Sequence, residues 1–278
     1  MALRGIKDLA ADLGLLWSLL NGELSDLTGV SASSIVATTE TQGQNDRSRE
    51  CELIWNCDRI AGDTNCSGSV LRSLRNENYA NKLSDVIVAW ISKRDQLRTA
   101  TRLLVDSWKP GVSREAQLGA LAQSLEAFHR ASNNQQVFVT KDEYATIETV
   151  LAQSIGDCVA NQDLKAALRK RIEYGNQVSL RRRTRDLFRS IRPTLRDNFG
   201  PWKPLVDWMT DVRNQVIHRD PEIPPKPHSE LVRVTGVLGL IIHASILQEI
   251  GVPDEILSAE RILMQSRYQT LIRYWNMP

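Results

Sequence analysis

Apolar residues recur at helical spacing along most of this 278-residue chain. Between Ile6 and Leu20 they stand three and four residues apart, a pattern that predicts an amphipathic helix ending near Gly22. Because this pattern begins with the first residues, we expect the chain to be the C-terminal part of a longer protein. Helical spacing returns between Val70 and Ile91, which predicts further helices in an N-terminal region.

The segment between these helical patterns is different. Apolar residues alternate with other residues at positions 35–39 and again at 51–57, and a polar stretch separates the two runs. Alternation is typical of β-strands, so we predict two short strands joined by a long loop.

The second half of the chain is predicted to be a helical bundle. Lys109-Pro110-Gly111 indicates a break, where we place the boundary between an N-terminal helical region, residues 1–110, and the bundle, residues 111–278. Thr140 and Glu143 have the spacing of a capping box, and Ser229 is a candidate cap for the helix that follows four prolines. The predicted bundle helices span residues 113–132, 140–159, 161–190, 203–219 and 229–250, with a last one near 254–275. The fold class is therefore mainly α, with additional N-terminal helices and a small β element.

Composition restricts the class of protein. Hydrophobic residues make up 42% of the chain, which is enough for a buried core. The four cysteines lack zinc-site spacing and are too few for a secreted disulfide scaffold, so we expect reduced thiols in a cytoplasmic protein. The longest apolar run, Val234 to Leu247, is too short to span a membrane and contains His243. We predict that this run is a buried helix with His243 in the core, and we expect no membrane partner.

The segment from Asp211 to Pro221 carries the residues best suited to chemistry. Arg213 is followed by Asn214 and then by His218, so the spacing is R-N-x-x-x-H. Histidine titrates near neutral pH and can act as acid or base, whereas arginine offers a permanently charged fork to phosphate oxygens. These residue types suit metal-independent RNA cleavage, in which the 2′-hydroxyl attacks the adjacent phosphate. Asn214 could bind the phosphate or orient His218.

A single regular helix would not complete this site. Five residues along an ideal helix turn the side chain by about 500°, so Arg213 and His218 would point roughly 140° apart. Either the helix ends near His218, as Pro221 indicates, or the partners meet across a subunit interface. The reaction also needs both an acid and a base, and two copies related by two-fold symmetry would supply two histidines. We therefore expect a homodimer or a higher even oligomer, with both core and interface supplied by apolar residues of the 229–250 helix such as Leu238, Leu240, Ile241 and Ile242.

A structural role for the Arg213–His218 pair is the alternative. A histidine near a helix C-terminus would interact favourably with the helix dipole, and Arg213 could pair with Asp211 or Glu222.

The R-N-x-x-x-H spacing resembles the motif of the HEPN superfamily of ribonucleases. Together with Leu125 to Arg130 (LEAFHR) upstream and the apolar helix downstream, it is similar to the HEPN domain of ApeA-type bacterial anti-phage proteins over residues 113–250. The resemblance implies an HEPN-type bundle, dimers with a composite cleft, and defence against phage by shutting down translation. ApeA-type proteins also carry a β-rich N-terminal sensor, which is not evident in this sequence. Glu126, His129 and Arg130 could face the same cleft, and the alternative is a solvated helix face.

Positive charge is concentrated between Leu168 and Arg192. Nine basic and two acidic residues give this stretch a charge of +7, against +2 for the whole chain. Such a patch is typical of a site for the RNA phosphate backbone, and the alternative is a solvated helix face paired with acidic neighbours. The predicted RNA contacts are Arg181, Arg182, Arg183 and Arg185.

The function predicted from the sequence is that of a metal-independent endoribonuclease. His218 would be the general acid or base, Arg213 the phosphate clamp and Asn214 a supporting group, with RNA, tRNA among the candidates, as substrate. We expect no metal and no organic cofactor, because the sequence holds no HExxH, P-loop or GxGxxG motif. Two alternatives are a catalytically silent HEPN module that binds nucleic acid or a partner, and a purely structural dimerisation bundle.

Overall fold

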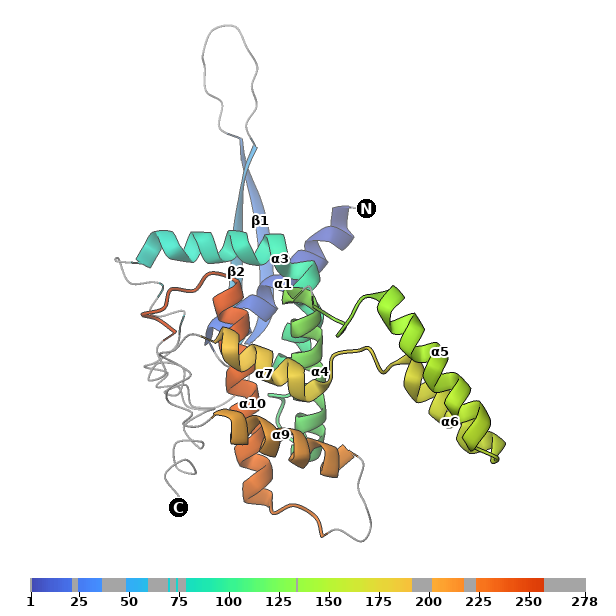
Figure 1. Cartoon of the computed structure of the whole chain (residues 1–278). Helices are drawn as coiled ribbons and strands as arrows, with labels where there is room; N and C mark the ends of the chain where they lie inside the picture. Colours follow the sequence, from blue (N-terminus) through green and yellow to red (C-terminus); the bar gives the residue numbers. More distant parts are fainter. Residues whose placement is uncertain are drawn as a thin grey trace, which may run out of the picture.

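Helices make up most of the structure (Figure 1). The computed structural model describes residues 2–21, 25–36, 49–59, 79–133, 135–191, 202–217 and 224–257, together with Val70 and Leu74. The mainly helical fold class predicted from the sequence is confirmed. The elements are α1 (Ala2–Asn21), β1 (Ser25–Val36), β2 (Arg49–Arg59), α3 (Ala80–Asp106), α4 (Arg114–Ser132), α5 (Lys141–Cys158), α6 (Gln162–Glu173), α7 (Leu180–Ser190), α9 (Trp202–Ile217) and α10 (His228–Glu249).

The core is built around α10. Every residue from Val237 to Leu247 is buried, and helices α3, α4, α7 and α9 pack around this helix (Figure 1). By length and composition α10 could cross a membrane, but 83% of its most apolar window is buried inside the structure. A helix that is apolar on all sides suits such a central position, so the predicted buried helix is confirmed.

The predicted interface on this helix is wrong. Its apolar residues are already covered by the chain's own helices, because Leu238 is 5% exposed, Leu240 is 1% exposed, and Ile241 and Ile242 are fully buried. These four side chains therefore offer no exposed apolar surface that a second copy could cover.

Buried polar contacts connect α1 to the rest of the core. The Trp90 indole donates a hydrogen bond to the carbonyl of Asp12 at 3.0 Å, and the buried Asp12 carboxylate accepts from Arg98 Nη2 at 2.8 Å. His243 lies in the core, as predicted, with Nε2 2.8 Å from the carbonyl of Leu19. Since a carbonyl only accepts, this nitrogen carries the proton.

Strands β1 and β2 pair antiparallel. Their register runs from Ser25 opposite Arg59 to Val36 opposite Arg49, with one irregularity between Leu27 and Gly29. Figure 1 shows this ribbon extending away from the helices.

Helices α5 and α6 form a hairpin that projects from the bundle (Figure 1). Two extended segments join it to α4 and α7, with a bridge between Val137 and Gln177, and Asn176 Oδ1 accepts from the Val139 amide at 3.0 Å. The capping box predicted at the start of α5 is confirmed, because the Thr140 side chain accepts from the Glu143 amide while the Glu143 carboxylate accepts from the Thr140 amide.

Two other helix boundaries differ from the predictions. The single helix predicted over residues 161–190 is wrong, because the chain turns at residues 174–179 and α7 begins again after the cap Ser179. A Cβ at Gly175 would meet the Tyr144 hydroxyl, so a larger residue at this turn would require the end of that side chain to move. Ser229 is not the cap predicted, since α10 begins at His228 after Pro227.

Most of the helix predicted at 254–275 lies outside the described residues, and the domain boundary at residue 110 stays a prediction.

Candidate active site

Arg213 lies near the C-terminal end of α9, where this helix packs against α4 and α7. Its half-buried side chain lines a gap of about 10 Å³ together with Leu125 of α4 and Leu180 and Thr184 of α7. The buried Nε has no hydrogen-bond acceptor among the described residues. An unpaired buried donor costs about 1–3 kcal/mol, and among the described residues it is helix packing, not an ion pair, that holds this guanidinium in place.

Asn214 is the neighbour that Arg213 contacts. Arg213 Nη1 donates to Asn214 Oδ1 at 3.0 Å. Asp211, the carboxylate expected to pair with Arg213 in a purely structural role, instead accepts from Arg181 Nη2 at 2.8 Å. Because an amide carries no charge, the positive charge of Arg213 is not balanced by any carboxylate within the described ranges.

His218 cannot be placed beside these two residues. The described part of α9 ends at Ile217, and His218, Pro221 and Glu222 lie outside the described residues. The predicted pairing of Arg213 with His218 therefore stays a prediction.

The three predicted cleft residues of α4 have different surroundings. The carboxylate of Glu126 lies 4.0 Å from the Arg130 guanidinium one turn later, and both side chains are partly exposed. His129 is buried and faces α7. His129 and Arg213 line two different cavities, and whether the α4 residues share a cleft with Arg213 stays a prediction.

Arg183 of α7 is the buried partner of His129. Its Nη1 contacts His129 Nδ1 at 2.9 Å and Gln136 Oε1 at 2.7 Å, and its Nε donates to the carbonyl of Val178 at 3.1 Å. Gln136 and Val178 belong to the two segments that carry the hairpin, so this cluster fixes the hairpin to the bundle.

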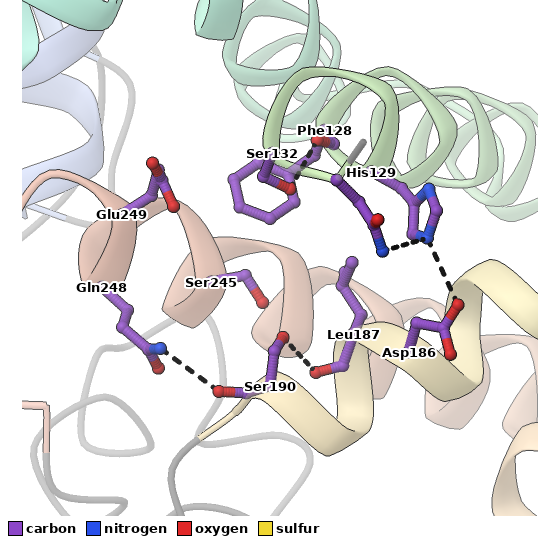
Figure 2. Close-up of a pocket in the computed structure, with 10 residues that line it drawn as sticks. Phe128, His129, Ser132, Asp186, Leu187, Ser190, Ser245, Gln248 and Glu249 are labelled. Carbon is purple, nitrogen blue, oxygen red and sulfur yellow. Dashed lines mark hydrogen bonds and ion pairs between the residues drawn. The ribbon is translucent and has the colours of Figure 1, made fainter. Parts of the chain in front are cut away.

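The contact with Arg183 determines the tautomer of His129. A guanidinium can only donate, so Nδ1 accepts and Nε2 carries the proton. Nε2 faces the Asp186 carboxylate at 3.5 Å, whereas Asn133 Nδ2 approaches it at 3.2 Å as a second donor. Asp186 is therefore the acceptor that suits this ring (Figure 2).

Burial keeps His129 neutral. Burial lowers the pKa of His129 below its ordinary value of 6.5, the positive charge of Arg183 lowers it further, and Asp186 opposes both effects. Burial also lowers the pKa of Arg183, assisted by the charge of Arg130, although a guanidinium stays protonated in proteins. A neutral histidine held between an arginine and a carboxylate positions its neighbours and is poorly placed to exchange protons with a substrate.

A cavity of about 160 Å³ adjoins this cluster between α4, α7 and α10 (Figure 2). Most of its polar groups are already paired, since the Ser132 hydroxyl donates to the Phe128 carbonyl and the Gln248 amide donates to the Ser190 carbonyl. The exception in the part of the chain that the structure describes is Ser245, whose buried hydroxyl has no partner. The lining residues are Phe128, His129, Ser132, Asn133, Asp186, Leu187, Ser190, Ser245, Gln248 and Glu249.

The burial of Arg183 corrects the predicted set of RNA contacts. Arg183 is 3% exposed and donates all its described hydrogen bonds inward, so it is not available to a phosphate backbone. The prediction rested on local charge density alone, which does not distinguish the buried side of a helix from its exposed side.

The other predicted RNA contacts lie at the surface of α7. Arg181 pairs with Asp207 and Asp211 of α9, and Arg182 pairs with Asp186 one turn later. Arg185 is half-buried on the same helix. The basic stretch is also divided, because Arg169, Lys170 and Arg171 lie on the projecting hairpin. Whether these arginines bind RNA stays a prediction.

Sequence reasoning missed Gln136 and Asp186. Each is ordinary in its local sequence, and each becomes part of the cluster only through contacts across the fold, as with the 47 residues that separate Gln136 from Arg183. No signal in the sequence pattern would have identified them.

The comparison with family models identified a domain in the second half of the chain. The family described as Apea-like HEPN matches residues 120–256, which runs from α4 to the residues just after α10. No curated protein and no solved structure matches the chain.

Proposed function

Because residues 120–256 form an Apea-like HEPN domain, we propose that this chain is an endoribonuclease that cleaves RNA without a metal ion. HEPN domains act on nucleic acids, and the family consists generally of ribonucleases. The observation that carries the proposal is the state of Arg213, a half-buried guanidinium whose charge is not balanced by any carboxylate in the described ranges, within the R-N-x-x-x-H segment. Such a group gains most by meeting an anionic phosphate.

The proposed reaction divides between two residues. His218 takes the proton from the 2′-hydroxyl, or returns one to the departing 5′-oxygen, while the 2′-oxygen bonds to phosphorus and the 5′-oxygen leaves. Arg213, oriented by Asn214, binds the phosphate oxygens as negative charge develops on them. Proton transfer by a positioned group contributes about 10²–10⁴-fold, and a preorganised donor about 10²–10³-fold. A second copy of the chain would supply the second histidine, so a homodimer is part of the proposal.

The test uses purified protein with total RNA in the presence of EDTA. The variants His218→Ala and Arg213→Ala should each lose RNA cleavage and any toxicity on expression. Their circular dichroism spectra should match that of the wild type, which shows that the fold is intact. Matched controls are His228→Ala, at the exposed start of α10, and Arg102→Ala, on the exposed side of α3, which should cleave normally. Wild-type cleavage by the His218 variant would remove the mechanism.

A catalytically silent module is the second candidate. It would bind RNA with the same salt dependence and leave it intact at every enzyme concentration. A role in anti-phage defence rests on the family resemblance, and it predicts that a strain expressing the chain resists phage only when Arg213 and His218 are both present.

A further inference from the structure

The cavity between α4, α7 and α10 contains a buried polar group that the described residues leave unsatisfied. Ser245 of α10 is 5% exposed and lines this cavity (Figure 2), and its hydroxyl has no hydrogen-bond partner. A buried hydroxyl left unpaired costs stability, so a ligand that bonds it recovers this cost. Ser132 and Ser190, which also line the cavity, are exposed and give it a side open to the surface.

The size and the walls of the cavity suit one flat ring. Its volume is about 160 Å³, and a cavity of about 150 Å³ is large enough to hold benzene. Phe128 of α4 and Leu187 of α7 line it from two helices (Figure 2), and both are buried. Because an aromatic side chain packs well against another planar ring, these walls favour a planar ligand over a flexible chain.

The polar groups of the cavity are mainly acceptors. The hydroxyls of Ser132 and Ser190 donate to backbone carbonyls of their own helices, so toward a ligand they can only accept. Asp186 and Glu249 add two carboxylates, each with about four acceptor sites. A ligand that fits these groups must therefore supply N–H donors.

The two carboxylates do not require a cationic ligand. Asp186 accepts from Arg182 Nε at 3.0 Å. Glu249 accepts from Lys93 Nζ at 2.6 Å, so both negative charges are already balanced. No lysine or arginine of the described ranges lines the cavity, so a phosphate would find no positive partner inside it. The ligand that fits is neutral, flat and rich in N–H donors, which describes a nucleobase with an exocyclic amine.

The cavity follows the gap at Arg213 along the same two helices. On α4, Leu125 lines the gap at Arg213, and His129, one turn later, lines the larger cavity. On α7, Thr184 and Leu187 do the same at a spacing of three residues. One helical turn advances about 5.4 Å, which is within the span of one nucleotide. A phosphate at Arg213 and a base in the cavity therefore have the spacing of neighbouring groups in one strand.

We propose that this cavity binds one amino-bearing nucleobase, with the amine donating to Asp186 and the Ser245 hydroxyl donating to a ring nitrogen or carbonyl. Carboxylates accept from the cytosine amine in the same way in nucleic-acid recognition. Uracil lacks the amine and is disfavoured. For a base within RNA the proposal rests on the proposed function and adds a sequence preference to it, whereas a free nucleoside offers the same chemistry.

The first experiment titrates the whole chain with cytidine, adenosine, guanosine and uridine in a calorimeter. The three amino-bearing nucleosides should bind with a Kd on the order of 0.1–1 mM, and uridine should bind at least about fivefold more weakly. Ser245→Ala removes an unpaired hydroxyl, so it should keep the wild-type Tm and weaken cytidine binding about 3- to 10-fold. The matched control is Thr101→Val, which removes another buried unpaired hydroxyl, on α3 and away from this cavity. This control should bind cytidine normally.

Two further variants test the selectivity and the place of binding. In Asp186→Asn the amide can donate to a uracil carbonyl, so the preference for cytidine over uridine should disappear. Loss of packing alone would weaken all four nucleosides equally and keep their ratio, which would contradict the role of Asp186. Ser190→Trp places a large side chain at an exposed position beside the cavity and should block all four nucleosides without a change in the circular dichroism spectrum.

The source of the base is tested with 2′-fluoro oligouridine, with and without a single cytidine. A preference for the cytidine-containing strand that Ser245→Ala removes identifies RNA as the source, whereas binding of cytidine without this preference identifies a free nucleoside. The proposal is overturned if neither nucleosides nor strands bind selectively, or if Ser245→Ala and Ser190→Trp leave cytidine binding unchanged. Because these strands lack the attacking 2′-hydroxyl, base binding and RNA cleavage can each fail without the other.

Discussion

Replacing Arg183 by methionine removes a buried guanidinium and keeps an unbranched side chain in its place. The variant leaves three acceptors without their donor, namely the Val178 carbonyl, His129 Nδ1 and Gln136 Oε1. The Val178 carbonyl and His129 Nδ1 are buried in these contacts, whereas Gln136 is half-buried. A buried acceptor left unpaired costs about 1–3 kcal/mol, while relief of the buried charge returns part of this. We expect Arg183→Met to lower the free energy of unfolding by about 2–4 kcal/mol.

Thermal unfolding followed by circular dichroism measures this effect. A loss of about 2–4 kcal/mol should lower Tm by roughly 5–15 °C for a chain of this size. The control is Arg185→Met on the same helix, which should change stability by no more than about 0.5 kcal/mol because its side chain is partly solvated. RNA affinity of folded Arg183→Met should match the wild type at low temperature. Unchanged Tm together with weaker, less salt-dependent RNA binding would show that Arg183 contacts RNA and is not held in the interior.

Two further predictions concern pH and salt. Because the pKa of His129 is lowered, the unfolded chain binds more protons near pH 6, so the stabilising contribution is complete above about pH 6.5 and is lost as pH falls. The variant His129→Asn, which keeps an acceptor for Arg183, should flatten the fall in Tm between about pH 7.5 and pH 5, and an unchanged slope would assign the acid sensitivity to another group. If Arg185 binds an RNA phosphate, Arg185→Gln should reduce the log–log salt slope of single-stranded RNA binding by about 0.7, and an identical slope would remove it from the RNA site.

Helices with a clear start signal were predictable from the sequence. The helices predicted at 113–132 and 140–159 agree with α4 and α5 to within one or two residues, because Ser113 and Thr140 cap them through contacts with residues only three positions away. The break between α6 and α7 was missed because their combined apolar and basic pattern is continuous. At this turn Gly175 lies against the Tyr144 hydroxyl of α5, which is a contact across the hairpin.

The sequence by itself determined the class of this protein. Helical spacing, local capping residues and the R-N-x-x-x-H segment are properties of neighbouring positions, so they identified the bundle and the family without a structure. Only the tertiary structure decided which of these side chains are buried and which are exposed for binding. It buried Arg183 against His129, covered the apolar residues of α10, and left α5 and α6 without a buried residue. The physical reason is that charge and hydrophobicity are properties of single residues, whereas burial depends on which distant helix packs against them.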